Sequence, residues 1–118
     1  MAKVLDLDVL RPEKDIVKLG GKDIDVSFLP LGLTFDIDDI VSECAKLDQE
    51  KLSASDTAEV KKAFALSVKL CVVFCEHQHP DMDQSWFDKN TTAAQIKGLG
   101  DRIRDALTRA YEGIDPKN

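Results

Sequence analysis

The sequence predicts an α+β domain, mostly helical, in which an N-terminal β-hairpin packs on a bundle of three main helices. Two short apolar runs on either side of Gly20-Gly21 indicate the hairpin, and three later segments have apolar residues at helical spacing. The chain has 118 residues, of which 43% are hydrophobic and 32% charged, as in one globular domain. We expect residues 1–118 to form this single domain, with residues 1–13 as a flexible arm and residues 114–118 as a flexible tail.

The first predicted strand covers residues 15–19, and the second covers residues 24–28. The second run alternates strictly between apolar and acidic or hydroxyl side chains, which is typical of a strand with one buried face. The Gly-Gly pair between the runs favours a tight turn. Because a two-stranded ribbon alone is marginal in water, its apolar face should lie against the helices.

The segment 29–33 is strongly apolar but contains Pro30 and Gly32, so it should end the second strand. Two interpretations remain open for it. It is either a buried corner or part of a partner-binding surface that includes Leu31 and Leu33.

The first predicted helix covers residues 35–47, capped by Thr34 or Asp36, and a polar connection over residues 49–54 follows it. A long helix should begin at Ser55 or Asp56 and continue to residue 77 or 78.

Almost every side chain from residue 63 to residue 75 is apolar. A helix that is apolar on all sides must be covered on several of them. The long helix is therefore expected to be central, covered by the hairpin and the other helices or partly by a second subunit. Both a compact monomer and a ring-like or helical self-assembly agree with this pattern.

Trp86 and Phe87 are the only adjacent aromatic residues, and they lie in a predicted short helical turn over residues 84–89. They form either a lid over the core or a contact surface, because aromatic anchors dominate interface energetics. The last helix should cover residues 93–111, since Thr92 and Gln95 match a capping box and Gly113 is placed to stop it.

The charge balance argues against two classes of partner. Acidic residues outnumber basic ones by 22 to 16, which gives a formal net charge of −6. Nucleic acids and anionic membranes both attract basic surfaces, so neither is expected as a partner. The only basic face, formed by Arg102, Arg104 and Arg109, is interpreted as a solvated helix side rather than as a nucleic-acid contact.

Four residues resemble a set of metal ligands: Cys71, Cys75, His77 and His79. Structural zinc sites use tighter cysteine turns, and these cysteines lie in an apolar helix, so we interpret them as reduced core residues. Neither a nucleophile nor a glycine-rich oxyanion loop accompanies the histidines. No enzyme activity, cofactor or metal is therefore expected.

Several motifs follow one another in a characteristic order. They are Leu19-Gly20-Gly21-Lys22-Asp23-Ile24 in the hairpin, Phe28-Leu29-Pro30-Leu31-Gly32-Leu33-Thr34-Phe35 before an acidic helix, His79-Pro80 after the buried helix, and Trp86-Phe87 before the last helix. In this arrangement, residues 14–113 resemble the tail assembly chaperones of long-tailed bacteriophages, particularly phages and prophages of Gram-positive bacteria.

The resemblance implies a protein that binds the phage tape measure protein and keeps it soluble until the tail tube polymerises around it. It also implies action in the cytoplasm of the bacterial host and absence from the mature virion. The candidate contact residues, Leu31, Leu33, Trp86 and Phe87, come from their own chemistry and not from the family. The alternatives are a small phage regulatory protein, a structural tail component, and an enzyme subunit that uses His77 and His79.

Overall fold

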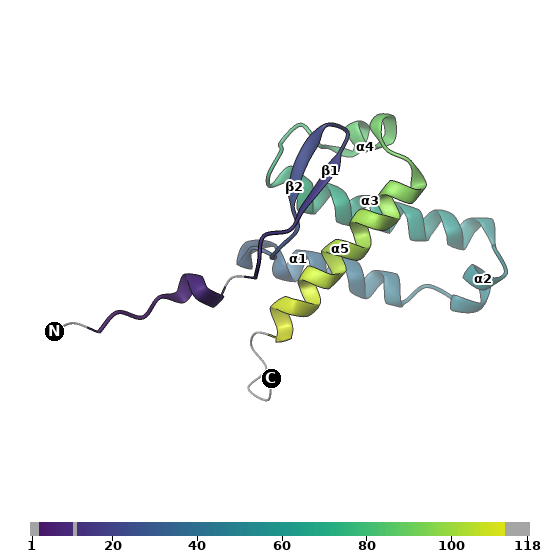
Figure 1. The fold of residues 1–118 in the computed structure, drawn as a ribbon. Helices are drawn as coiled ribbons and strands as arrows, with labels where there is room; N and C mark the ends of the chain where they lie inside the picture. Colours follow the sequence, from purple (N-terminus) through teal and green to yellow (C-terminus); the bar gives the residue numbers. More distant parts are fainter. Residues whose placement is uncertain (1–2, 11, 113–118) are drawn as a thin grey trace.

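The computed structural model describes residues 3–10 and 12–112 and confirms the mostly helical α+β class (Figure 1). The described elements are a 3₁₀ turn at Leu7–Leu10, β1 at Ile16–Leu19, β2 at Lys22–Asp25, α1 at Leu31–Ala45, α2 at Gln49–Ser53, α3 at Thr57–Glu76, α4 at Gln84–Asn90 and α5 at Ala93–Glu112. The predicted stop at Gly113 and the predicted tail over residues 114–118 lie outside the described residues.

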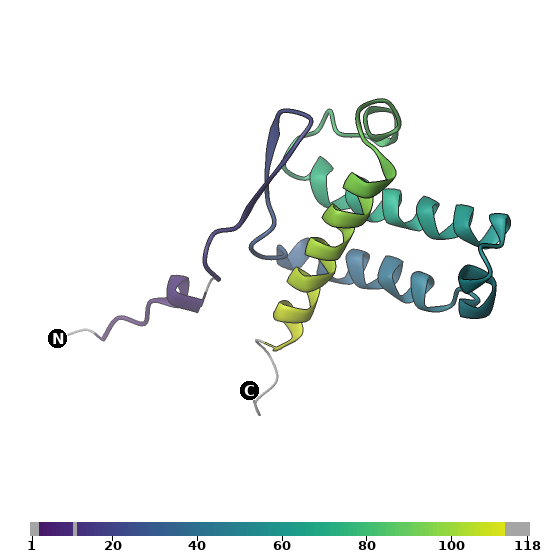
Figure 2. The same ribbon diagram turned by 45° about the vertical axis from the view of Figure 1, so that its right-hand side comes forward.

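Three helices form the body of the domain. Helices α1 and α3 lie side by side, and α5 crosses over both of them (Figures 1 and 2). The hairpin and α4 lie near the end of the layer away from α2. The core is one cluster of buried residues: Leu19, Ile24, Val26, Leu29, Ile37, Ile40, Leu70, Cys71, Phe74, Cys75, Met82, Phe87, Ile96, Leu99, Ile103, Ala106 and Leu107. The hairpin is thus packed on a bundle of three main helices, as predicted.

The hairpin turns through its two glycines. Gly20 has φ +57° and Gly21 has φ +80°, and both values lie in the left-handed region that glycine adopts without steric cost. Leu19 pairs with Lys22 across the turn, and the register places Val17 opposite Ile24. The strands are shorter than predicted, since the second predicted strand extended to residue 28 and β2 ends at Asp25.

The outer edge of β2 contacts the residues that follow α3. The side-chain amide of Gln78 donates to the carbonyl of Asp25 at 2.8 Å, and the amide N–H of Asp25 donates to Oε1 of Gln78 at 2.8 Å. His79 Nε2 lies 2.7 Å from the carbonyl of Asp23. Gln78 and His79 thus bond to the edge of β2 at which a third strand would pair, and they connect the hairpin to the central helix α3.

Helix α1 begins at Leu31, four residues earlier than predicted, so the expected start at residue 35 is wrong. Pro30 is the N-cap residue, with φ −56° and ψ 143°. The first N–H groups of a helix have no intrahelical partner, so a proline before the helix and Gly32 within its first turn are tolerated. Neither Thr34 nor Asp36 caps the helix, and Thr34 Oγ1 instead donates to the carbonyl of Pro30 at 3.2 Å.

The predicted polar connection over residues 49–54 contains a short helix, α2, which the sequence analysis missed. Its N-cap is Asp48, whose carboxylate accepts from the amides of Glu50 and Lys51 at 3.0 and 3.2 Å. Glu59 of α3 is only 6% exposed and accepts from the amide of Asp48 at 3.1 Å. This carboxylate therefore connects the start of α2 to α3.

Substitution Glu59→Gln is expected to reduce the loss of stability in acid. The hydrogen bond from the amide of Asp48, together with the ammonium of Lys62 at 3.1 Å, holds the pKa of Glu59 below its usual value. A carboxyl group with a lowered pKa stabilises the fold above its unfolded-state pKa, and this contribution is lost as the pH falls. Urea unfolding between about pH 5 and about pH 3 should therefore show that the free energy of unfolding falls less steeply with pH for the variant than for the wild type. Glu43→Gln, at an exposed position, is the control, and equal slopes for Glu59→Gln and wild type would contradict the prediction.

Helices α3 and α5 begin as predicted. Asp56 caps α3 by accepting from the amide of Glu59 at 3.1 Å. Thr92 and Gln95 form the capping box of α5, with reciprocal bonds of 2.9 and 3.3 Å. Helix α3 ends at Glu76, one residue short of the predicted range, and it contacts each of the other four helices.

Candidate functional site

The four candidate contact residues differ widely in exposure. Leu31 is 83% exposed in the first turn of α1, whereas Phe87 in α4 is 1% exposed. Leu33 and Trp86 are half-buried and pack against the core. The structure therefore does not bring the four together into one surface.

Trp86 and Phe87 form the lid that was one of the two interpretations. Their rings lie 5.1 Å apart between centroids, edge to face at 84°. The Trp86 ring also lies directly against the backbone of Gly20 and so packs on the hairpin turn. Phe87, the next residue of α4, is 1% exposed and belongs to the core cluster. Phe87 is therefore removed from the candidate contact surface.

An exposed aromatic residue that the sequence analysis did not single out lies beside Leu31. Phe35 is 68% exposed and lies four residues further along α1, so the two side chains share one face of the helix. We call this pair the α1 apolar face. The four-residue spacing of Leu31 and Phe35 in the sequence indicates a shared helix face, but only if the helix begins at residue 31.

Helix α5 borders this region through its last turn. Tyr111 is 36% exposed, and burial together with a hydrogen bond to Asp38 of α1 raises the pKa of Tyr111. The α1 apolar face thus lies on a helix whose neighbouring positions are fixed by contacts with α5. A rigid helix that exposes two large apolar side chains can dock against an apolar stripe of another protein.

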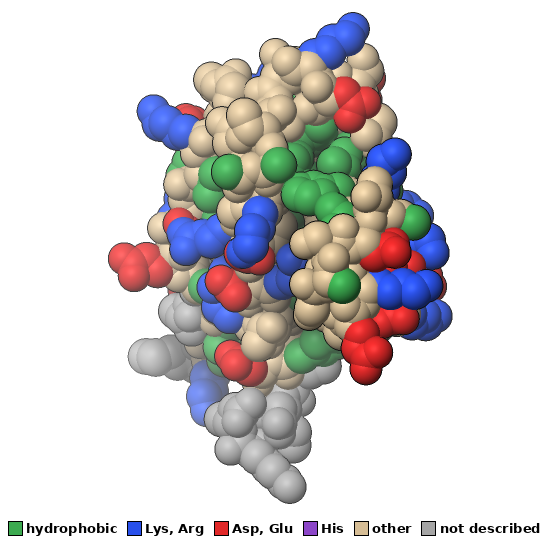
Figure 3. Space-filling model, turned by 90° about the vertical axis from the view of Figure 1, so that its right-hand side faces the viewer, with side chains coloured by type: hydrophobic (Ala, Val, Ile, Leu, Met, Phe, Trp, Pro, Cys, Tyr) green, Lys and Arg blue, Asp and Glu red, His purple; other side chains and the backbone are tan. Residues whose placement is uncertain are grey.

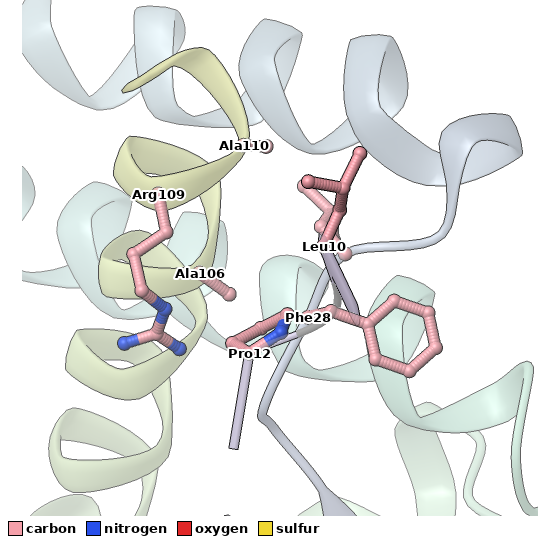
Figure 4. A pocket seen from close by; sticks show the side chains of 7 residues that line it. Leu10, Pro12, Phe28, Ala106, Arg109 and Ala110 are labelled. Atoms are coloured by element: carbon pink, nitrogen blue, oxygen red, sulfur yellow. The ribbon is translucent and has the colours of Figure 1, made fainter. Parts of the chain in front are cut away.

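A pocket of about 250 Å³ lies where the N-terminal segment passes α5. Figure 4 shows its lining side chains, with Arg109 on one side and Phe28 on the other. The residues that line it are Leu10, Pro12, Phe28, Leu29, Ala106, Arg109 and Ala110. Among the described residues of the lining, Arg109 is the one that carries a charge, and it donates to the carbonyls of Val26 and Ser27 at 3.2 and 3.3 Å. These described lining residues provide no carboxylate, histidine, thiol or hydroxyl for acid–base or nucleophilic chemistry.

The three arginines of the basic face of α5 bond to other residues of the chain. Arg102 forms an ion pair with Asp15 before β1, and Arg104 lies 3.5 Å from a carboxylate oxygen of Asp101. With Arg109 bonded to backbone carbonyls, all three guanidinium groups have partners within the chain. Arg102 and Arg109 are exposed and Arg104 is half-buried, which agrees with a solvated helix side, and their bonds connect this side of α5 to its surroundings.

The four possible metal ligands face different parts of the molecule. Cys71 and Cys75 are buried, and Cys71 Sγ lies 3.8 Å from the carbonyl of Ile96 in α5. His79 faces the hairpin instead, while His77 is exposed. Burial raises the pKa of Cys71 to about 12 and also raises the pKa of Cys75, so both remain thiols. Over residues 3–10 and 12–112, no group of three or more His, Cys, Asp or Glu side chains could hold a metal ion.

The chain matches no known family model, curated protein or solved structure. The candidate surface is therefore defined by the residues of this chain alone. Among the helices that the structure describes, none is both long enough and apolar enough to cross a bilayer.

Proposed function

We propose that this protein is a phage tail assembly chaperone. It binds the tape measure protein and keeps it soluble until the tail tube polymerises around it, without catalysing a reaction. It acts in the cytoplasm of the bacterial host and is absent from the finished virion. The order of motifs over residues 14–113 supports this assignment, together with the acidic balance of the chain.

The α1 apolar face is the observation that carries the proposal. Leu31 and Phe35 are 83% and 68% exposed on a helix whose opposite side is anchored in the core by Ile37 and Ile40. Such a pair at helical spacing fits the apolar stripe of a long helical protein. A chaperone that must later release its client benefits from a small contact, because two side chains bury little area compared with a stable interface.

Co-expression with the tape measure protein of the phage or prophage that encodes this chain tests the proposal. The wild-type chain should keep the tape measure protein in the soluble fraction and co-purify with it. The double substitution Leu31→Ser and Phe35→Ser should reduce the co-purified amount by roughly tenfold or more, as expected when aromatic and aliphatic anchors are lost. Its stability should stay close to that of the wild type, because both side chains are exposed.

The matched control is the double substitution Glu43→Gln and Lys46→Gln, which removes an exposed ion pair between the last turn of the same helix and its C-cap residue. It should leave co-purification unchanged. A tape measure protein that stays insoluble with the folded wild-type chain would contradict the proposal, as would full co-purification by the Leu31/Phe35 variant. Detection of the chain in finished particles would instead favour the structural tail component.

A further inference from the structure

The α1 apolar face is bordered by acidic side chains. Helix α1 contains no lysine or arginine, and its charged residues are Asp36, Asp38, Asp39 and Glu43. Asp39 lies four residues beyond Phe35, so it continues the line of Leu31 and Phe35 along the helix surface. Asp36 lies three residues before Asp39 and borders the same side. A partner that covers the two apolar side chains therefore also meets carboxylates.

Two of these carboxylates have no cation of their own. Asp36 and Asp39 are exposed, and none of the ion pairs among the described residues includes either of them. The other two acids of α1 are engaged within the chain, since Asp38 bonds to Tyr111 and Glu43 pairs with Lys46 at 3.1 Å. Asp36 and Asp39 thus present negative charge to whatever covers the α1 apolar face.

A hollow between α3 and α5 has the opposite character. Its lining residues are Ala63, Phe64, Ser67, Lys97 and Arg104, and its volume is about 110 Å³. Figure 3 views the molecule from the side on which α2 lies, and it shows apolar side chains in a hollow with Lys and Arg side chains beside it. Phe64 is 41% exposed, less than either residue of the α1 apolar face. The two surfaces therefore select partners of opposite charge, and the α1 apolar face offers the greater apolar exposure.

The acidic border also disfavours other occupants of the α1 apolar face. Two copies that met through this face would bring carboxylates against carboxylates, and like charges brought together across an interface oppose binding. Anionic membranes and nucleic acids are repelled for the same reason. A partner with cations beside its apolar residues gains attraction instead.

We propose that the α1 apolar face binds amphipathic helices whose apolar stripe is bordered by lysine or arginine. Apolar residues of the partner at a spacing of about 6 Å, one helical turn, cover Leu31 and Phe35. Basic side chains beside that stripe pair with Asp36 and Asp39. The inference rests on the proposed function for the identity of the client, and it specifies which segments of a tape measure protein are bound.

Two synthetic peptides of about 20 residues, long enough to be helical in isolation, test the proposal against the full-length chain. Both carry a leucine stripe at helical spacing. One has lysine and the other glutamate beside the stripe, two residues of similar helix propensity. In fluorescence anisotropy, the lysine peptide should bind about tenfold more tightly. The difference should shrink as the ionic strength rises from about 0.01 M to about 0.15 M, because the Debye length falls from about 30 Å to about 8 Å.

The double substitution Asp36→Asn and Asp39→Asn should remove most of the preference for the lysine peptide. The matched control is Glu50→Gln with Glu76→Gln, which removes the same amount of negative charge at exposed positions of α2 and α3. The control should keep the preference, because the chain as a whole then attracts cations no more than the Asn variant does. Circular dichroism should show that both variants are folded.

Three results would overturn the inference. They are equal binding of the two peptides, no binding of the lysine peptide, and a preference that survives in the Asn variant. Binding of the lysine peptide should also be lost in the Leu31→Ser and Phe35→Ser variant, and its persistence there would place the contact elsewhere. Tighter binding of the glutamate peptide, lost with Phe64→Ser, would move the docking site to the hollow between α3 and α5.

The outcomes separate this inference from the proposed function. If the tape measure protein co-purifies with the chain but the two peptides bind equally, the charge preference is wrong and the chaperone assignment stands. If the lysine peptide is preferred but the tape measure protein stays insoluble, the chaperone assignment is wrong and the α1 apolar face still selects basic helices.

Discussion

Replacing Phe87 by alanine is expected to destabilise the domain by about 3–5 kcal/mol, the range measured for large aromatic residues in protein cores. Phe87 is 1% exposed and belongs to the main core cluster, where its ring contacts the edge of Trp86. Truncation would leave a cavity beneath α4 that the surrounding helices can fill only in part. Urea unfolding at neutral pH measures the change directly.

Phe35→Ala is the matched control, because Phe35 is the same residue type but is 68% exposed. Its effect on stability should be within about 0.5 kcal/mol. If Phe87→Ala left the free energy of unfolding unchanged but abolished binding of the tape measure protein, the assignment of Phe87 to the core would be wrong.

Gly20→Ala is expected to cost about 2–4 kcal/mol, through two separate effects. The φ of +57° is strained for any residue with a side chain, at about 1–2 kcal/mol. A Cβ atom at this position would also lie 2.8 and 2.9 Å from Cζ2 and Cη2 of Trp86, so either the indole ring or the turn must move. Thermal unfolding followed by the fluorescence of Trp86, the only tryptophan in the chain, measures both the stability and the environment of the ring.

Gly21→Ala separates the two effects. Gly21 has φ +80°, but an added Cβ would meet nothing within 4 Å. This variant should therefore lose only the backbone contribution, about 1–2 kcal/mol, and should keep the wild-type emission of Trp86. Equal losses for the two variants would show that the indole ring adapts to the added methyl group without cost.

The strength of the local signals decided how much of the fold could be predicted. Gly20-Gly21 specified the turn, and the side chains at Asp56 and Thr92 specified two helix starts, because their chemistry is local. The start of α1 has no side-chain cap, so Pro30 and Gly32 were interpreted as a break in structure rather than as the first turn. Helix α2 was missed because it has no fully buried residue, so it leaves no apolar pattern in the sequence.

The candidate contact surface was less predictable than the fold. Apolar residues at the end of a predicted element are compatible with a core position or a surface position, and only the packing of other elements distinguishes them. Leu31 and Leu33 differ by two residues in one helix and therefore face different directions. The assignment of Trp86 and Phe87 to a lid over the core likewise depends on where the hairpin turn lies, which is a contact between residues far apart in the chain.

The contacts of Gln78 and His79 with β2 restrict how another chain can be recognised. An exposed strand edge is a template for strand addition and for aggregation into extended sheets. The carbonyl of Asp23 and both outward backbone groups of Asp25 already bond to side chains that follow α3. An extended peptide therefore cannot join the sheet at this edge by β-augmentation without displacing these side chains.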